Sequence, residues 1–185
     1  DSSRKSLHKA GILVEKHNLT REYGIYHEYL AELEYCVGSF DKALDEIETT
    51  LEHAYKLSSA SALISQGERL KAEILVQLGK EQEAVSSARK ALEVAEEIGE
   101  KLEAGAAKRV LAEIYAQRKD IQKAREYIYN SIELVKESGA RYDLARAYIS
   151  AYMIHSGNIG ESRYYLQLAR EMYSGMNLEF NLVRS

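Results

Sequence analysis

The chain has 185 residues, a length that suits one domain with a buried core. Its 25 basic and 29 acidic residues give a net charge of −4, and the interspersed signs argue against a basic surface for nucleic acid. The one cysteine, Cys36, cannot form an internal disulfide, and no run of 18 apolar residues could span a membrane. We therefore expect a cytoplasmic protein without a membrane segment and without direct nucleic-acid binding.

Helix is the expected secondary structure throughout the chain. Proline, which interrupts helices, is absent, and the helix-favouring residues Ala, Leu, Glu and Lys are plentiful. Apolar residues recur at helical spacing on both sides of short glycine-containing turns, as at Leu70, Ile74 and Leu78 before Gly79. In chain order, this pattern predicts helices over 3–17, 21–37, 41–57, 60–78, 81–98, 101–118, 121–138, 140–156 and 159–174.

Four windows of equal length share one skeleton, at residues 35–51, 76–92, 116–132 and 154–170. Small residues recur in each window at intervals of 41, 40 and 38 residues, and a third small position in the preceding helices keeps the same rhythm. Helices that pack closely need small residues where they cross. We therefore expect burial of three sets: Ala31, Ala72, Ala112 and Ser150; Ala43, Ala84, Ala124 and Ser162; Thr50, Ala91, Ser131 and Ala169.

The turns between the predicted helices carry recognisable end signals. Gly99, Gly139 and Gly175 stand where the second helix of each pair should end, a place where a left-handed residue is easiest for glycine. Ser39, Asp120 and Asn158 precede second helices, and their side chains can accept the free backbone N–H groups. These signals predict repeated helix pairs joined by tight turns. In the second pair, Lys80 replaces the capping residue.

The skeleton repeats from residue 24 to about 175, and in the first unit it consists of Leu30, Ala31, Tyr35, Gly38 and Ala43. It resembles the tetratricopeptide repeat in a long-period form. The resemblance implies an all-α, right-handed α–α superhelix built from stacked helix pairs. Residues 1–185 would form a single solenoid domain with a partial repeat at 3–17, repeats near 21–58, 60–99, 101–139 and 140–175, and a final segment at 176–185. Apolar residues in that last segment, including Phe180, indicate a fragment of a larger protein.

Nothing in the chain predicts catalysis. The five histidines lack the spacing of metal ligands, and Cys36 has no evident neighbouring base, so it is best interpreted as a small hydrophobe on a helix face. The sequence GNIG at 157–160 is too short for a phosphate-binding loop. We expect no catalytic residue, no metal site, no cofactor and no enzyme activity.

Tyrosine is unusually frequent, with 14 residues. Most of them are expected to pack where helices cross, for example Tyr115, Tyr127 and Tyr164. A role in recognition stays open for the tyrosines of helix 21–37 and of helix 140–156, because tyrosine is enriched at interfaces. These residues are Tyr23, Tyr26, Tyr29, Tyr35, Tyr148 and Tyr152.

The resemblance also implies that the first helix of each pair lines a concave groove. Arg69 with Glu73, and Arg109 with Glu113, are four residues apart and can pair locally. The candidate partner-binding residues are Glu28, Glu32, Tyr35, Gln66, Arg69, Glu73, Gln77, Arg109, Glu113, Gln117, Tyr148 and His155. We expect a non-enzymatic module that binds a protein or peptide partner in this groove.

Two further possibilities concern the whole protein. The chain could be the sensory domain of a bacterial signalling or transcription regulator, which would relay ligand or peptide binding to an attached effector domain. An exposed end of the solenoid could also stack against a second copy and give a homo-oligomer.

Overall fold

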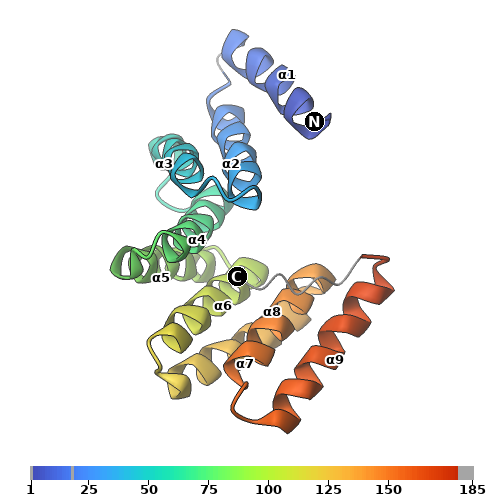
Figure 1. The fold of residues 1–185 in the computed structure, drawn as a ribbon. Helices are drawn as coiled ribbons and strands as arrows, with labels where there is room; N and C mark the ends of the chain where they lie inside the picture. Colours follow the sequence, from blue (N-terminus) through green and yellow to red (C-terminus); the bar gives the residue numbers. More distant parts are fainter. Residues whose placement is uncertain (1, 18, 179–185) are drawn as a thin grey trace. The chain divides into compact units, whose positions relative to one another are not determined.

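The structure is a computed structural model that describes residues 2–17 and 19–178. Within these residues the chain forms nine α-helices and no strand (Figure 1). Each predicted helix is present, and no end differs from the prediction by more than two residues. The helices are α1 (Ser2–Lys16), α2 (Thr20–Cys36), α3 (Phe40–Leu57), α4 (Ala62–Gln77), α5 (Glu81–Glu97), α6 (Lys101–Gln117), α7 (Ile121–Ser138), α8 (Arg141–Ile154) and α9 (Ile159–Gly175).

Left-handed residues end most of the helices, as the glycine pattern predicts. Gly99 and Gly139 have φ angles of 74° and 75°, and Lys119 takes the same conformation at 63° where the three other repeats have glycine. The prediction for Gly175 is wrong. It is the last residue of α9, and Asn177, with φ 54°, is the left-handed residue that follows this helix.

The side-chain caps are confirmed at two of the three predicted places. Asp120 accepts the backbone N–H of Lys123, and Asn158 accepts those of the first turn of α9. Ser39 precedes α3 but makes no capping hydrogen bond, so the prediction for its side chain is wrong. Ser61, which the sequence pattern did not single out, caps α4 through the N–H of Ile64.

The contacts divide the chain into two compact units, Asp1–Glu103 and Ala104–Ser185, with the boundary inside α6. In the N-terminal unit α2 packs on α3, α3 on α4, and α4 on α5; in the C-terminal unit α7 packs on α8, and α8 on α9. Figure 1 lets the reader follow these neighbouring helices within each unit. That residues 1–185 form one continuous solenoid domain stays a prediction. Residues 179–185 of the predicted last segment lie outside the described residues.

All twelve small positions predicted to lie at helix crossings are buried. In the N-terminal unit, Ala31 of α2 and Ala43 of α3 have no exposed surface and belong to one cluster with Ile47, Leu70 and Ile74. Because the two alanines occupy little space, the larger aliphatic side chains can fill the gap between three helices. The repeat therefore originates in packing, as the spacing predicts.

Two glycines inside helices test this packing further. A methyl group at Gly105 of α6 would lie 2.6 Å from Cγ2 of Val135 and 3.2 Å from Cβ of Leu134. Glycine to alanine inside a helix normally stabilises by about 1 kcal/mol. We expect Gly105→Ala instead to lower the free energy of unfolding by about 1 kcal/mol, because the clash outweighs the helix preference. Urea denaturation measures the change.

Gly175→Ala is the matched control for this substitution. Its new methyl group would meet the flexible end of Arg141, at 2.7 Å from Nη2, which can move away at little cost. We expect this variant to be as stable as the parent chain or slightly more stable. Equal stabilisation by both substitutions would contradict the tight approach of α6 and α7 at Gly105.

Candidate functional site

Arg69 on α4 links charged side chains from successive first helices of the N-terminal unit. Its Nη1 lies 3.1 Å from Oε1 of Glu73 on the same helix, and its Nε lies 3.0 Å from Oε2 of Glu103 at the start of α6. The Arg69 side chain is only 12% exposed, and that of Glu73 5%. The predicted local pair of Arg69 with Glu73 is therefore present, and Glu103 is a partner that the sequence pattern did not reveal.

Two predicted residues of α2, Glu28 and Glu32, belong to the same electrostatic environment. Burial, reinforced by Glu32 and Glu103 and opposed by Arg69, raises the pKa of Glu28 to about 7. We call the five residues Glu28, Glu32, Arg69, Glu73 and Glu103 the first-helix face. It contains four carboxyl groups and one guanidinium group, so its charge is negative when most of the carboxyl groups are ionised.

The C-terminal unit repeats part of this arrangement. Nη1 of Arg109 lies 2.7 Å from Oε1 of Glu113, so the second predicted local pair is also present. The hydroxyl of Ser150 on α8 donates to the same Glu113 oxygen, at 2.5 Å. Glu113 therefore joins the first helices α6 and α8 through one carboxylate. Arg109 is 5% exposed, which leaves little of its side chain for contact with a partner.

The other predicted groove residues have varied surroundings. Gln77 and Gln117 are exposed, and Gln66 is partly exposed. Tyr35 packs on Phe40, with ring centroids 5.7 Å apart, beside the core of the N-terminal unit. Cys36, next to Tyr35, is an exposed free thiol rather than a packed hydrophobe.

His155 was predicted to face a partner, and this prediction is wrong because its side chain is 0% exposed. Its Nδ1 lies 2.8 Å from the Ala151 carbonyl oxygen, which can only accept, so the neutral ring carries its hydrogen on Nδ1. Nε2 then accepts the hydrogen bond of the Tyr129 hydroxyl, at 2.9 Å. Oε2 of Glu161 lies 3.6 Å from the same nitrogen. His155, which follows α8, is thus bonded to α7 through Tyr129.

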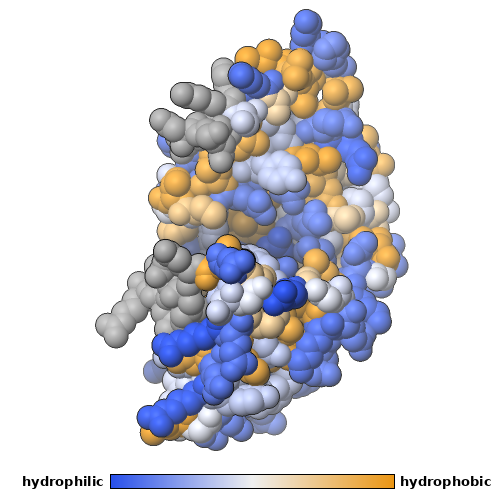
Figure 2. All heavy atoms as spheres, turned by 90° about the vertical axis from the view of Figure 1, so that its right-hand side faces the viewer, coloured by the Kyte–Doolittle hydropathy of each residue, from blue (hydrophilic) through white to orange (hydrophobic). Residues whose placement is uncertain are grey.

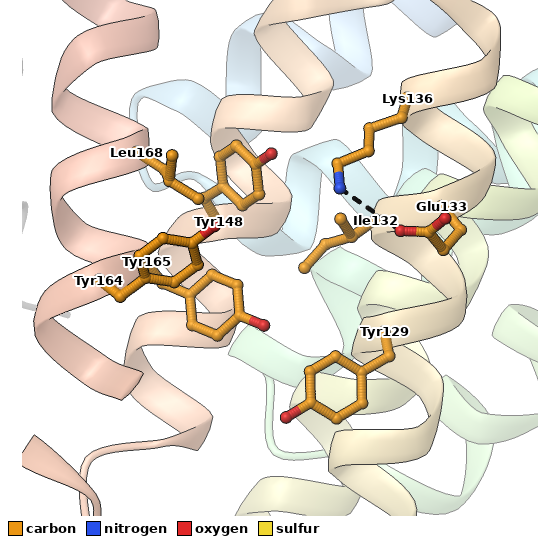
Figure 3. Close-up of a pocket in the computed structure, with 8 residues that line it drawn as sticks. All are labelled: Tyr129, Ile132, Glu133, Lys136, Tyr148, Tyr164, Tyr165 and Leu168. Carbon is orange, nitrogen blue, oxygen red and sulfur yellow. Dashed lines mark hydrogen bonds and ion pairs between the residues drawn. The ribbon is translucent and has the colours of Figure 1, made fainter. Parts of the chain in front are cut away.

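Tyr148 is also mostly buried, and it lies at a hollow between α7, α8 and α9 (Figure 3). We call this hollow, of about 130 Å³, the tyrosine pocket. Its walls come mainly from the second helices α7 and α9, so the repeat pattern of the first helices does not indicate it. The lining residues are Tyr129, Ile132, Glu133, Lys136, Tyr148, Tyr164, Tyr165 and Leu168.

The tyrosines predicted to pack at helix crossings divide into two groups. Tyr115 and Tyr127 stack in parallel, with centroids 5.4 Å apart and an angle of 6° between the rings, as expected. Tyr164 is 59% exposed, so the packing prediction is wrong for this residue. On the face that Figure 2 draws, hydrophobic and hydrophilic residues are interspersed.

Two further findings concern the described residues, 2–17 and 19–178. Among them, no group of three or more His, Cys, Asp or Glu side chains is arranged to hold a metal ion. Over the same residues, no helix combines the length and the apolar character needed to cross a bilayer.

Residues 58–137, which contain α4 to α6 and most of α7, match the family model of the tetratricopeptide repeat. Residues 58–137 are tetratricopeptide repeats. No curated protein sequence matches the chain.

Two solved structures extend the likeness in fold beyond the matched tetratricopeptide repeats. BtubC (BKLC) from P. vanneervenii has a TM-score of 0.72 at 19% identity, over 100% of this chain and 80% of that one. Aspartyl phosphate phosphatase F from Bacillus subtilis has a TM-score of 0.70 at 20% identity, over 85% of this chain and 42% of that one. At such low identity these structures support the helical-repeat fold alone. The predicted all-α solenoid of tetratricopeptide type is confirmed.

Proposed function

We propose that this chain is a non-enzymatic module that binds a protein or peptide partner along the first-helix face of its N-terminal unit. Tetratricopeptide repeats form helical scaffolds for protein interaction. The observation that carries the proposal is the double ion pair of Arg69, which joins side chains of α4 and α6 while α2 contributes Glu28 and Glu32 beside it.

Rigidity supports this role. Because Arg69, Glu73 and Glu103 are mostly buried and paired, they keep their positions before a partner arrives. Less side-chain entropy is then lost on binding, which improves affinity for a given contact area. Glu32 is exposed at the edge of this fixed group and is available for direct contact.

The charge of the face indicates the chemistry of the partner. Four carboxyl groups surround one guanidinium, and the pKa of about 7 at Glu28 reflects burial together with this crowding of negative charge. A partner that brings Lys or Arg side chains would relieve the repulsion. Electrostatic complementarity of this kind increases the association rate and the selectivity for the partner.

Selection of a random peptide library against the chain tests the proposal. We expect the selected peptides to be enriched in Lys and Arg, and we expect Glu32→Lys to weaken their binding by about tenfold, or about 1.4 kcal/mol. Glu126→Lys on α7 is the control, because Glu126 is an exposed carboxylate of the C-terminal unit and is not one of the five residues of this face. Fluorescence anisotropy of a labelled peptide measures both affinities. Peptides that bind equally to the parent chain and Glu32→Lys would refute the assignment of the face.

A further inference from the structure

The tyrosine pocket consists of residues other than those of the first-helix face, so it requires an explanation of its own. It is open at the surface and closed below. Tyr164 and Tyr129 at its rim are 59% and 41% exposed, whereas Ile132 and Tyr148 at its base are almost fully buried. Figure 3 shows Tyr129, Glu133 and Lys136 along one helix, across the hollow from Tyr148, Tyr164 and Tyr165.

The aromatic walls are fixed in place by the surrounding structure. The Tyr129 hydroxyl donates to buried His155, so this ring is anchored at its far end. The Tyr165 ring lies 6.1 Å from that of Tyr148 and 5.4 Å from that of Tyr164, measured between centroids. A set of rings held in this way offers apolar surface with little entropy to lose on binding.

The charges around the pocket favour an uncharged occupant. Glu133 and Lys136 lie 3.4 Å apart on the same helix and largely cancel each other. Burial raises the pKa of Tyr148, and burial together with Tyr129 raises that of Tyr165 to about 12. The hydroxyl groups of Tyr148 and Tyr165 therefore stay protonated and uncharged at neutral pH.

We propose that the tyrosine pocket binds a proline ring from a proline-rich segment of a partner protein. Such segments prefer the polyproline II helix, which is already extended and therefore loses little entropy on docking. Proline has no backbone N–H that burial would leave unpaired, and its neighbouring carbonyl oxygens can accept hydrogen bonds from tyrosine hydroxyls. Grooves lined with aromatic side chains recognise this conformation. The 185 residues contain no proline, so the occupant is not among them.

Titration with a decaproline peptide tests this inference. We expect chemical-shift changes at the pocket residues in two-dimensional NMR spectra, and we expect Tyr164→Ala to weaken binding by about tenfold. Tyr164→Phe should keep most of the affinity, because the ring supplies the apolar contact. Tyr142→Ala on α8 is the matched control. Tyr142 is 51% exposed and lies outside the pocket, so we expect less than a twofold change.

Several results would overturn the inference. One is that decaproline causes no chemical-shift changes at the pocket residues. Another is that Tyr142→Ala and Tyr164→Ala weaken binding equally. A third is that decalysine or decaglutamate binds at these tyrosines and decaproline does not. Circular dichroism of each variant shows whether the fold is intact. Failure here leaves the proposal for the first-helix face standing, because that test uses other residues and a different peptide.

Discussion

Ala84→Leu is expected to lower the free energy of unfolding by about 2–3 kcal/mol, the upper part of the usual range for overpacking. Ala84 lies on α5, which packs on α4, and it is 0% exposed. A leucine there adds three carbon atoms to a place without free surface. Either the two helices must move apart or the new side chain must take a strained rotamer. Urea denaturation followed by circular dichroism measures the loss.

Ser86→Leu on the same helix is the control for this substitution. Ser86 is exposed, so its replacement by leucine changes hydrophobicity and helix preference without a steric conflict. We expect a change within about 0.5 kcal/mol. If Ala84→Leu proved as harmless as Ser86→Leu, the proposed role of small residues at helix crossings would be wrong.

Glu28→Gln is expected to raise the free energy of unfolding at pH 8 by about 2 kcal/mol. Burial and neighbouring carboxylates raise the pKa of Glu28 from 4.5 to about 7 in the folded chain. Keeping the carboxylate ionised in the folded state therefore costs about 3 kcal/mol relative to the unfolded chain. Glutamine removes this net cost, which already includes the attraction to Arg69, and desolvation of the buried amide explains the smaller net gain.

The stability gained by Glu28→Gln should depend on pH, because the ionisation of Glu28 does. Between pH 4.5 and pH 7 the folded chain holds a proton on Glu28 that the unfolded chain has released, so rising pH destabilises the folded state over this interval. The gain from Glu28→Gln should therefore fall below about 1 kcal/mol at pH 5. Denaturant titrations at pH 5 and pH 8 measure both values.

Glu97→Gln is the control for the pH experiment. Glu97 is an exposed carboxylate on α5, so its replacement should change stability little at either pH. A gain from Glu28→Gln that is equal at pH 5 and pH 8 would show that desolvation of the Glu28 charge is not the cause.

The sequence was sufficient to predict the helices and their spacing because both depend on short-range signals. Gly99 and Gly139 adopt the left-handed conformation expected of residues that follow a helix, and Ala43 and Ala84 are buried as their spacing predicts. Lys119 has the same backbone conformation without being glycine. The surrounding turn imposes it, so residue type alone would have given no reason to expect it.

The candidate site could be predicted only in part. Helical spacing identifies pairs such as Arg69 and Glu73, but it does not reveal that Arg69 also reaches Glu103 on another helix. Helical spacing also does not predict which way a side chain points at the end of a helix. His155 follows the last residue of α8, where its ring turns inward to bond Tyr129 instead of facing a partner. Such positions depend on tertiary packing, which a repeat pattern does not encode.

The exposed thiol at the end of α2 makes the molecule convenient to label. Cys36 is the only cysteine in the chain and follows Tyr35, about one helical turn after Glu32 and about two after Glu28. A maleimide fluorophore can therefore be attached at one defined place without engineering. Its emission would report the arrival of a ligand at the adjacent surface in real time.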